Sequence, residues 1–410
     1  MNQTTSAIPD TAPVEELALG TDPIPAGPYF EQTWFRDEVE AIFKRTWINI
    51  GHRCELPEQG SYIVRELEFA NASLLIVRGT DDCIRAFHNV CPHRGTQLIS
   101  DSREGRAGVF SCPYHRWTFN HDGSLRAAPD FQRFYLDKSQ CSLNEVAIGE
   151  VAGMLYVNLD KNPQQSLQDF LGCLASEMEG TIIAKADNFS EYVYEIEANW
   201  KVTYDNFQEN YHLTFVHPRS GVATSGADNP FGYPLAYGFH DPHRTQTIWT
   251  NADYQPSSTM MTAFTALGRK AAQTGFMNAT GTKQYFAVFP SLFMFGSLMQ
   301  PFTHQVYPIS ATRSRGVIRI YWIGEDDNAS TRFAREYAMA SARDIHSEDF
   351  SIIEAGQRGL NSGALSHIHY QQQEVLCRHL FEQVRQRVEA YRSQMIATDT
   401  FQNINQESRL

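Results

Sequence analysis

The chain has 410 residues, more than one compact hydrophobic core normally serves, so we expect two domains. Hydrophobic residues make up 42% of the sequence and charged residues 20%, a composition typical of a folded globular protein. The formal net charge of -13 argues against an extended basic face, and therefore against binding of nucleic acid or of an anionic membrane surface.

The sequence contains no segment that predicts secretion or membrane insertion. The N-terminus lacks a basic region followed by an apolar stretch. The longest nearly apolar run, 287–299, is too short to span a bilayer and contains Pro290. Seven cysteines form an odd set without regular spacing, which does not indicate a disulfide framework. We therefore expect a cytoplasmic protein.

The predicted elements begin with a leader and a short helix. Residues 1 to about 28 are rich in Pro, Thr and Ala and predict a loose leader, and apolar residues at helical spacing predict a helix over roughly 31–47. From 48 to about 160, short β-branched and apolar runs alternate with turns, among them Asp122-Gly123, a typical hairpin signal. This part of the chain predicts a small all-β domain.

The second half of the chain mixes helices and strands. We expect a linker and a helix at 161–180, a strand at 191–200, and a long irregular stretch from 220 to about 282, of the kind that often forms a lid or binding loop. Three strands and then two helices follow, at 283–296, 304–310, 316–325, 331–359 and 370–392. Strands followed by terminal helices predict an α+β domain with an antiparallel sheet.

Acidic residues and histidines are concentrated directly after the strand expected at 191–200. Asp205, Glu209 and His212 are four and three residues apart and would share one face of a helix. Pro218 disfavours helical geometry at His217, which can therefore leave the helix and turn towards His212. Two imidazoles with a nearby carboxylate suit a divalent iron site that keeps positions open for oxygen. The alternative is a helix end whose histidines and acids are only polar surface.

A second group of candidate ligands lies upstream, in the predicted all-β domain. Cys91 and His93 form a C-x-H pair, and Cys112 and His115 form a C-x₂-H pair, each in a tight loop. Two thiolates and two imidazoles from paired loops match the ligands of a Rieske [2Fe–2S] centre, in which the cysteines hold one iron and the histidines hold the other. A Cys₂His₂ zinc site is the alternative, but structural zinc loops usually pair cysteine with cysteine and histidine with histidine.

With both groups of ligands in view, the chain resembles the catalytic α-subunit of the Rieske non-haem iron oxygenases, from about 29 to 392. The family's iron motif is an acid, three residues, Asp, two residues, His, four residues, His; Asp205, Glu209, His212 and His217 stand in that register. The resemblance implies that the two histidines bind a mononuclear iron and makes Glu209 and Asp205 the candidate catalytic residues. It also implies that Glu209, where most members have Asp, bridges to a Rieske histidine of a neighbouring subunit.

The resemblance further implies a third iron ligand, a carboxylate from a late helix. In the segment EDFSIIEAGQRGL (348–360), Asp349 stands at that position. A site of two histidines and one carboxylate needs this group. The competing carboxylates nearby are Asp344, Glu348 and Glu354.

The fold that the resemblance implies is α+β. An N-terminal all-β Rieske [2Fe–2S] domain would occupy 46–160, and a C-terminal helix-grip catalytic domain, with an antiparallel sheet over a long helix, would occupy 161–410. Residues 1–45 would form a leader and a helix that packs on the catalytic domain. A head-to-tail homotrimer is expected, and the presence of a β-subunit is left open.

The function that the resemblance implies is that of a terminal oxygenase. It would use O₂, mononuclear Fe(II) and electrons from NAD(P)H to hydroxylate or oxidatively demethylate a small organic substrate. The electrons would arrive through a separate reductase or ferredoxin, because this chain lacks a G-x-G-x-x-G fingerprint and the ferredoxin cysteine spacing.

The substrate is expected to be aromatic, and the alternative is a quaternary ammonium compound of the betaine or carnitine type, since relatives that oxidise such compounds carry a glutamate at the position of Glu209. We expect most aromatic residues of the late strands in the core and a few in a pocket or cation–π cage. These residues are Phe286, Phe289, Phe293, Phe295, Phe302 and Tyr307. A Rieske electron-transfer protein without oxygenase activity and a zinc-stabilised binding module are the alternatives from other classes.

Overall fold

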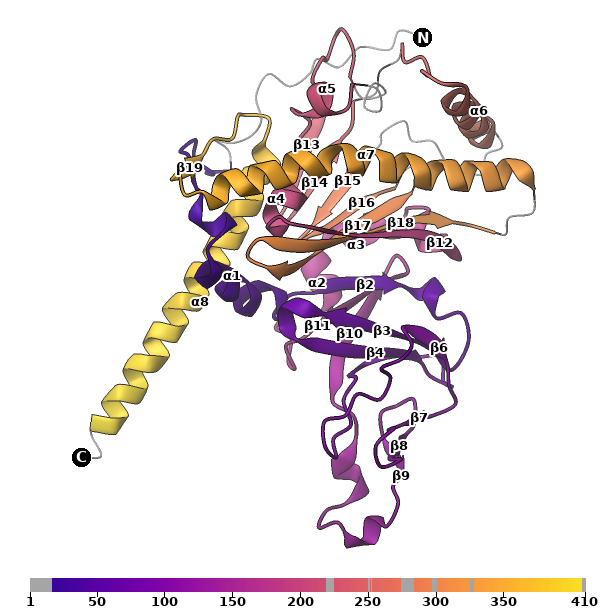
Figure 1. The fold of residues 1–410 in the computed structure, drawn as a ribbon, viewed down its shortest axis with the longest axis vertical. Helices are drawn as coiled ribbons and strands as arrows, with labels where there is room; N and C mark the ends of the chain where they lie inside the picture. The colour runs from indigo at the N-terminus through magenta and orange to yellow at the C-terminus, as the bar shows by residue number, and fades with distance from the viewer. Residues whose placement is uncertain are drawn as a thin grey trace. The chain divides into compact units, whose positions relative to one another are not determined.

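A computed structural model describes residues 17–218, 225–249, 251, 253–273, 284–296, 301–324 and 328–407. The chain divides into two compact units, whose ribbons are drawn in Figure 1. The β unit comprises Phe43–Gly180 and Ala184–Asn188. The α+β unit comprises the described residues within Met1–Ile42, Thr181–Ile183 and Phe189–Leu410. The predicted α+β class, with an all-β part followed by a mixed part, is confirmed.

The β unit is built on a seven-stranded antiparallel sheet in the order β2-β11-β10-β5-β4-β3-β6 and a three-stranded sheet in the order β7-β8-β9. The predicted hairpin at Asp122-Gly123 is confirmed, because this turn joins β8 to β9. Gly123 has a φ of +79°, and a Cβ there would lie 2.5 Å from the ring of Phe87. The strands are β2 (Ile48–His52), β3 (Ser61–Leu67), β4 (Ala72–Arg78), β5 (Ile84–His88), β6 (Glu104–Arg106), β7 (Phe110–Ser111), β8 (Thr118–Phe119), β9 (Leu125–Ala127), β10 (Glu145–Val151) and β11 (Met154–Asn158).

Two short helices extend the β unit beyond residue 160, where the sequence analysis placed the boundary. The helices α2 (Leu167–Leu171) and α3 (Cys173–Glu179) pack on β10. Glu179 accepts a hydrogen bond of 2.7 Å from the backbone N–H of Ala152. Leu167 lies so close to β10 that a Cβ on Gly149 would approach it to 2.8 Å. These contacts tie the helices to the sheet, so the compact unit continues to Gly180 and also includes Ala184–Asn188.

The α+β unit is built on a second seven-stranded sheet, in the order β12-β18-β17-β16-β15-β14-β13. The pairs from β18 to β13 are antiparallel. The strands are β12 (Asn188–Ile196), β13 (Ala236–His240), β14 (His243–Thr247), β15 (Gln284–Val288), β16 (Leu292–Phe295), β17 (Phe302–Ser310) and β18 (Arg313–Trp322).

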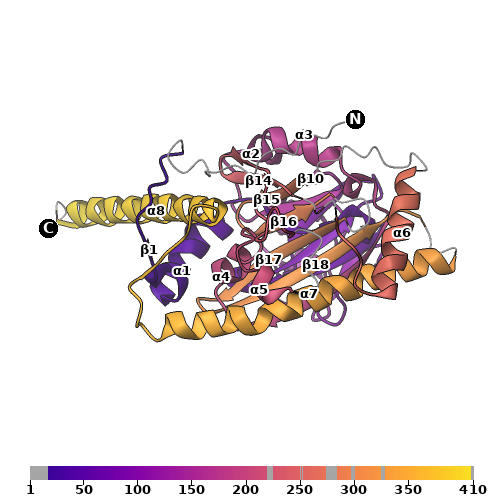
Figure 2. The ribbon, with the colours of Figure 1, turned by 90° about the horizontal axis from the view of Figure 1, so that it is seen from above.

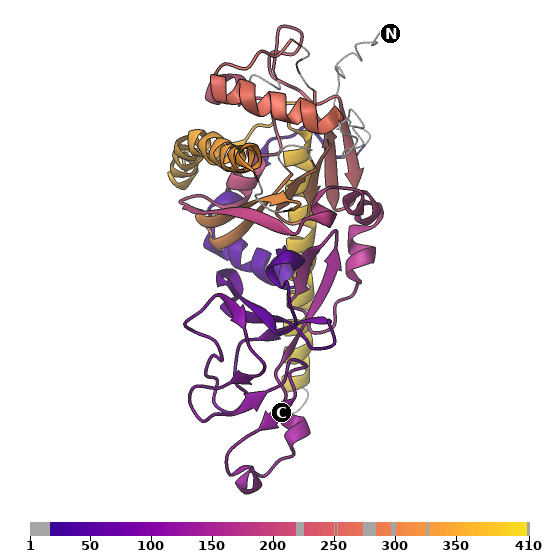
Figure 3. The same cartoon turned by 90° about the vertical axis from the view of Figure 1, so that its right-hand side faces the viewer.

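One face of this sheet is crossed by the long helix α7 (Ala329–Asn361), as Figures 1 and 2 show. The buried residues of α7 are three or four positions apart and form one stripe, which is the pattern of a helix with one face on a core. They are Arg335, Ala338, Ala342, His346, Asp349, Ile353, Gln357 and Leu360. The helix α6 (Thr259–Gln273) packs on α7, with the ring of Phe264 5.0 Å from that of Tyr337 (Figure 3).

The second long helix, α8 (Val375–Glu407), lies beside α1 (Gln32–Glu38) in Figures 1 and 2. A hydrogen bond of 2.7 Å joins Arg392 to Asp37. Next to this contact, α4 (Trp200–Asp205) brings Lys201 2.5 Å from Glu38, and both side chains are fully buried. Glu38 also accepts hydrogen bonds from the indole N–H groups of Trp34 and Trp200, so its carboxylate is well satisfied.

The prediction of a loose leader up to residue 28 is wrong for its last part. The short strand β1 (Ile24–Pro25) pairs with β19 (His367–Ile368), and Ile24, Ala26 and Tyr29 are buried in a core cluster with Phe381 of α8. Residues 1–16 lie outside the described residues. The helix expected at 31–47 is shorter, since α1 continues only through a π turn at Val39–Phe43.

The prediction of an irregular stretch at 220–282 is also wrong where the structure describes it. It contains the hairpin β13–β14 and the helix α6, and its residues 220–224, 250, 252 and 274–282 lie outside the described residues. The strand β14 was missed because its buried residues, His243, Arg244, Thr245 and Gln246, are all polar. Among the described residues, no helix is both long enough and apolar enough to cross a membrane.

The remaining short elements are single turns and one short helix. The helix α5 (Leu213–Val216) follows α4 in the α+β unit. Turns of 3₁₀ helix occur at Gly27–Tyr29, Arg53–Glu55, Glu68–Ala70, Phe131–Arg133, Lys138–Cys141 and Ile183–Lys185.

Candidate metal centres

Two loops of the β unit present the upstream candidate ligands, and their backbones have the same form. In the first loop the N–H of Gly95 donates to the carbonyl of Cys91 (2.9 Å), and in the second the N–H of Arg116 donates to the carbonyl of Cys112 (3.0 Å). Gly95 and Arg116 both have positive φ angles, +77° and +58°. The matching turns project a cysteine and a histidine from each loop.

The four side chains of these loops come together, as predicted. Cys91 and Cys112 are buried, and their thiols are within hydrogen-bonding contact. The rings of His93 and His115 lie 4.6 Å apart. The Nδ1 atoms of both histidines are buried without a hydrogen-bond partner. Buried polar atoms normally have hydrogen-bond partners. Two unpartnered nitrogens next to two sulfurs therefore match the ligand set of a bound [2Fe–2S] cluster.

Burial favours the neutral forms of Cys91 and His93. Burial, with a smaller contribution from the neighbouring Cys112, raises the pKa of the Cys91 thiol to about 11. Burial also lowers the pKa of His93, with a contribution from His115. A neutral imidazole is the form that binds metal, and a metal would be needed to draw the proton from such a thiol.

Aromatic rings hold the two imidazoles in place. His93 stacks on Trp117, with centroids 4.9 Å apart and planes 5° from parallel. Phe134 lies edge-on to His93 at 5.4 Å. The exposed ring of Tyr114 lies 3.6 Å from that of His115. The rings therefore have little freedom to turn away from the cysteines.

The second group of predicted ligands also comes together, in the α+β unit. Each of His212, His217 and Asp349 offers a ligand atom, and these three atoms lie within 4.8 Å of one another. Oδ1 of Asp349 is 3.0 Å from Nε2 of His217 and 3.7 Å from Nε2 of His212. His217 has φ -113° and ψ 49°, so it leaves the helical conformation as Pro218 predicts.

The path of the chain to this group differs from the prediction of a single helix face. The helix α4 ends at Asp205, and α5 begins at Leu213, so Glu209 lies in the loop between them. The Glu209 carboxylate accepts hydrogen bonds from the backbone N–H groups of Tyr211 and His212. A carboxylate that captures backbone donors in this way begins a new turn and competes with continuation of the old helix.

A carboxylate contacts each of the two histidines at Nδ1, the ring nitrogen that faces away from Asp349. Nδ1 of His212 contacts Glu209, and Nδ1 of His217 lies 2.6 Å from Glu348. Because a carboxylate only accepts, each Nδ1 carries the hydrogen, and each Nε2 lone pair faces Asp349. Burial would lower the pKa of His217, but the neighbouring carboxylates of Asp349 and Glu348 raise it above its ordinary value.

Among the four acids weighed as the third ligand, the geometry favours Asp349. Its side chain is 2% exposed, and its Oδ1 lacks a hydrogen-bond partner. Asp344 is exposed beside Arg343, and Glu354 accepts a hydrogen bond from the backbone of Glu197. Glu348 instead contacts Nδ1 of His217 and orients its ring. The sequence contained no signal for that contact, which joins segments 131 positions apart.

Asp205 lies apart from the three candidate ligands. Its carboxylate accepts hydrogen bonds from Tyr370 (2.7 Å), Tyr29 (3.3 Å) and Gln208 (3.1 Å), and none of its described hydrogen bonds reaches His212, His217 or Asp349. Burial raises the pKa of Asp205 to about 7, although the tyrosine hydrogen bonds and nearby cations oppose the shift. The structure therefore shows Asp205 as the centre of a buried polar network.

The sheet face that meets α7, the helix that carries Asp349, presents two rows of residues that include several aromatic rings. On adjacent strands Arg244, Ala287, Phe293 and His304 stand opposite one another, so they share this face. The next such row holds Gln246, Tyr285, Phe295 and Phe302. Tyr285 lies 4.7 Å from Phe293 and 4.4 Å from Phe295, and Phe207 contacts His304 and His346.

The six aromatic residues singled out in the late strands thus divide between two faces. Phe293, Phe295 and Phe302 belong to the face that meets α7. Phe286 and Tyr307 belong to the opposite face, and Phe289 lies under Arg387 of α8.

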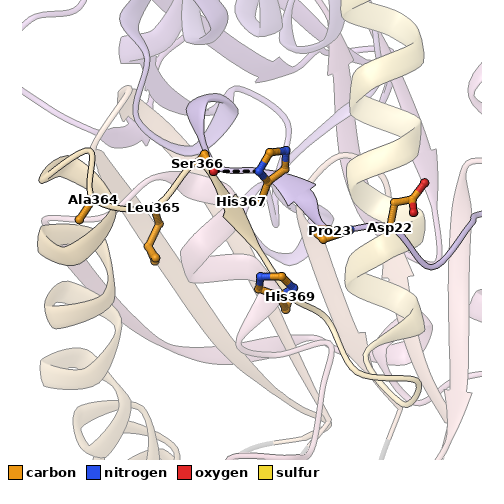
Figure 4. A pocket seen from close by; sticks show the side chains of 7 residues that line it. All are labelled: Asp22, Pro23, Ala364, Leu365, Ser366, His367 and His369. Carbon is orange, nitrogen blue, oxygen red and sulfur yellow. Dashed lines mark hydrogen bonds between the residues drawn. The ribbon is translucent and has the colours of Figure 1, made fainter.

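An open pocket elsewhere in the α+β unit has a volume of about 470 Å³ (Figure 4). Its lining residues come from two segments, before β1 and around β19: Asp22, Pro23, Ala364, Leu365, Ser366, His367 and His369. A hydrogen bond of 3.0 Å between His367 and Ser366 crosses its rim. The pocket shares no residue with either group of candidate ligands, so it does not contribute to their chemistry.

Comparison with protein families matches both units. Residues 183–390 match the ring hydroxylating alpha subunit (catalytic domain), and residues 46–146 match the Rieske [2Fe-2S] domain. The first of these matches covers half of the chain and contains His212, His217 and Asp349. The second contains all four cysteine and histidine residues of the paired loops.

Curated relatives align with part of this chain. The carnitine monooxygenase oxygenase subunit of Acinetobacter baumannii is 37% identical over 220 residues, which are 52% of this chain and 58% of that protein. The corresponding subunit of Escherichia coli is 36% identical over 230 residues, 53% of this chain and 59% of that protein. The glycine betaine monooxygenase oxygenase subunit of Chromohalobacter salexigens is 32% identical, over 55% of this chain and 50% of that protein. The matches thus span only between half and three-fifths of these relatives.

Solved structures align over nearly the whole chain. The quaternary ammonium Rieske monooxygenase CntA, in complex with an inhibitor, superposes with a TM-score of 0.73 at 26% identity, over 89% of this chain and 95% of that chain. A further structure of a quaternary ammonium Rieske monooxygenase, described for carnitine oxidation and inter-subunit electron transfer, gives 0.72 at 26%, over 90% and 95%. Naphthalene 1,2-dioxygenase from Rhodococcus sp. gives 0.70 at 20%, over 92% and 96%, which shows the shared fold.

Proposed function

The chain belongs to the family of ring-hydroxylating oxygenase alpha subunits, with its Rieske [2Fe–2S] and catalytic domains, and we propose that it is the terminal oxygenase of a system that oxidises a quaternary ammonium compound. Electrons from NAD(P)H reach it through a separate reductase. The similarity to carnitine and glycine betaine monooxygenase subunits supports this substrate class over the aromatic substrate expected first. The seven cysteines, all among the described residues, form no disulfide bond, which suits a reducing compartment.

In this proposal the paired loops hold the Rieske cluster. Cys91 and Cys112 bind one iron through sulfur, and His93 and His115 bind the other through Nδ1. The support is the pair of buried Nδ1 atoms without partners, next to two thiols in mutual contact. Zinc is disfavoured because each loop supplies one ligand of each kind.

The mononuclear iron is held by His212, His217 and Asp349. Two Nε2 atoms and one carboxylate oxygen on one side of a metal leave positions open, as in non-haem iron oxygenases. When bound, the iron supplies the site at which O₂ is activated. Glu209 and Glu348 keep the hydrogen on each Nδ1 and so keep each Nε2 available to the metal.

The observation that carries the substrate class, besides the relatives, is the aromatic sheet face that meets α7, the helix that carries Asp349. Tyr285, Phe293, Phe295 and Phe302 form a continuous set of ring contacts on the sheet face that meets α7. A quaternary ammonium group has no hydrogen to donate, so it is recognised through the faces of aromatic rings. The same rings exclude water from the reacting carbon.

The proposed overall reaction balances as a monooxygenation. One atom of O₂ enters a C–H bond on a carbon attached to the quaternary nitrogen, and the other leaves as water, with two electrons from NAD(P)H and two protons. The resulting carbinol loses a proton from its hydroxyl group as the C–N bond breaks, which yields an aldehyde and a tertiary amine.

The proposal includes a homotrimer in which electrons cross between subunits. A related structure is described for inter-subunit electron transfer. Glu209 is the candidate bridge, because one of its oxygens contacts His212 and its carboxylate would reach His115 of the neighbouring subunit. A ring of head-to-tail contacts closes this arrangement.

A substrate panel tests the proposed function. The purified holoprotein, a reductase and NADH are incubated with L-carnitine, γ-butyrobetaine, glycine betaine and a set of aromatic acids, and products are identified by mass. We expect NADH-dependent loss of at least one trimethylammonium compound, with Asp349→Ala as the inactive control. Turnover of an aromatic acid without turnover of any trimethylammonium compound would overturn the proposed substrate class.

A further inference from the structure

Two buried histidines beside the candidate iron ligands each leave one ring nitrogen without a partner. His304 on β17 is 0% exposed and His346 on α7 is 6% exposed. Among the described residues, Nδ1 of His304 and Nε2 of His346 have no hydrogen-bond partner. Orphaned buried nitrogens are costly, so a pair of them in one place indicates a missing ligand.

The free nitrogen of His346 is a hydrogen-bond acceptor. Its Nδ1 lies 2.6 Å from the backbone carbonyl of Ala342. A carbonyl only accepts, so Nδ1 carries the hydrogen, and in the neutral imidazole Nε2 has a bare lone pair. Burial lowers the pKa of His346, which agrees with the neutral form.

The free nitrogen of His304 is a hydrogen-bond donor. Its Nε2 lies 2.7 Å from the hydroxyl of Tyr194, and this is the only hydrogen bond described for that phenol. The phenol hydrogen is satisfied only if it is donated to Nε2, and the neutral ring then carries its own hydrogen on Nδ1. Burial, with His346 nearby, lowers the pKa of His304 well below its ordinary value.

The two rings are held close together and near the candidate ligands. Their centroids lie 5.2 Å apart at 85°, and Phe207 contacts both, at 4.4 Å from His304 and 4.9 Å from His346. His346 stands one helical turn before Asp349 on the buried stripe of α7. Burial lowers the pKa of His346, and the charges of Asp349 and His217 act on it in opposite directions.

A donor and an acceptor on two rings whose centroids lie 5.2 Å apart match one chemical group, the hydroxyl. We propose that His304 and His346 bind a hydroxyl group of the substrate, and hence that the preferred substrates are hydroxylated quaternary ammonium compounds. The hydroxyl oxygen accepts from Nδ1–H of His304, and its hydrogen is donated to Nε2 of His346. A carboxylate does not fit this pair, because it only accepts hydrogen bonds and would be repelled by the lone pair on Nε2 of His346. A trimethylammonium group does not fit either, because it has neither a donor nor an acceptor.

This inference rests on the proposed function and narrows it. Without substrate, an ordered water can bridge the two nitrogens. A substrate hydroxyl replaces that water and restores both hydrogen bonds. A substrate that lacks the hydroxyl must either leave the water in place or leave the two nitrogens without partners. Two neutral hydrogen bonds correspond to a preference of roughly 10- to 100-fold for the hydroxylated substrate.

The test compares two compounds that differ by one hydroxyl group, L-carnitine and γ-butyrobetaine. For the wild-type holoprotein and the variants His304→Leu and His346→Leu, kcat/KM is measured with the reductase, and Kd is measured by calorimetry without turnover. We expect the wild type to prefer L-carnitine in both measurements. Each variant should lose that preference while it keeps γ-butyrobetaine binding within about threefold.

Two further variants separate recognition of the hydroxyl from damage to the fold. Tyr194→Phe removes the group that fixes the hydrogen on His304, so it should reduce the preference in part. His379→Leu is the matched control, because His379 is another buried histidine with an unpartnered Nδ1, on α8, and its loss should leave the preference unchanged. If a leucine variant does not fold, His346→Gln replaces it, and thermal unfolding followed by circular dichroism reports folding.

The outcomes distinguish this inference from the function on which it rests. Equal use of both compounds by the wild type, or a preference that survives both histidine replacements, overturns the inference and leaves the function in place. A preference lost equally in His379→Leu overturns it as well. If the wild type turns over neither compound but does turn over an aromatic acid, the proposed function and the inference both fall.

Discussion

The replacement Glu209→Gln should weaken binding of the mononuclear iron and slow the electron that reaches it. The Glu209 carboxylate accepts hydrogen bonds from Nδ1 of His212, from the backbone N–H of His212 at 3.3 Å, and from that of Tyr211. An amide has one acceptor atom in place of two and carries no charge. A charge-assisted bond of about 1.5–3 kcal/mol is therefore lost, which corresponds to a roughly 10- to 100-fold loss of iron affinity.

The replacement Glu348→Gln is the matched control. Glu348 contacts Nδ1 of His217 at 2.6 Å, as Glu209 contacts His212, but its side chain is 38% exposed, so water can replace part of the lost bond. We expect an iron affinity lower by about tenfold, the lower end of the range for such outer partners. The bridging part proposed for Glu209 does not extend to Glu348, so this variant should keep the wild-type rate of electron transfer once iron is saturating.

The assay is single-turnover oxidation of a pre-reduced Rieske cluster, followed by its visible absorption, in both variants loaded with excess iron. Glu209→Gln should transfer its electron about 10- to 100-fold more slowly than the wild type, and Glu348→Gln should match the wild type. Equal slowing in the two variants would show that Glu209 only orients His212, as Glu348 orients His217, and does not act as a bridge between subunits. Wild-type rates in both would refute the bridge.

Four further outcomes are expected. Asp349→Ala should lose the mononuclear iron and all turnover but keep the Rieske absorption, since the two units have separate cores; metal analysis that finds wild-type iron would show that another acid is the ligand. His115→Cys should lower the reduction potential of the cluster, because thiolate stabilises the oxidised state; an unchanged potential measured by redox titration would exclude His115 as a ligand. Lys201→Met leaves Glu38 buried without its cation and should cost about 3–5 kcal/mol in the free energy of unfolding; denaturant titration should show much of this recovered in the double variant with Glu38→Gln. Asp205 binds its proton more tightly when folded, with a pKa of about 7, so ionising it lowers stability as pH rises from about 4 to 7; Asp205→Asn should gain up to about 4 kcal/mol relative to the wild type between pH 4 and pH 8, and a pH-independent difference in thermal unfolding would contradict this.

The proximity of the candidate ligands in the paired loops could be predicted because their spacing is local in the chain. Cys91 and His93, and likewise Cys112 and His115, are neighbours in sequence, and a tight turn brings them together whatever the rest of the fold does. Pro218 acts in the same local way on His217. Such features depend on the backbone of a few residues, so the residue types alone indicate them.

The features that the sequence analysis missed depend on contacts between distant segments. Glu348 orients His217 across 131 positions, and the pairing of β1 with β19 joins residue 24 to residue 368. The single helix expected from Asp205 to His212 fails because Glu209 captures backbone donors, a choice that helical spacing does not reveal. Buried polar strands such as β14 break the hydrophobic pattern on which strand prediction rests.

The most direct test of the central claim is a single turnover without any reductase. The holoprotein is reduced chemically, freed of reductant, and mixed with O₂ and L-carnitine, and the product is measured by mass against the reoxidation of the cluster. The proposed oxygenase should form a tertiary amine in an amount stoichiometric with the mononuclear iron, and only while the cluster is oxidised. Complete oxidation of the cluster with no product from any trimethylammonium compound, and with only the two irons of the cluster per chain, would instead identify an electron-transfer protein.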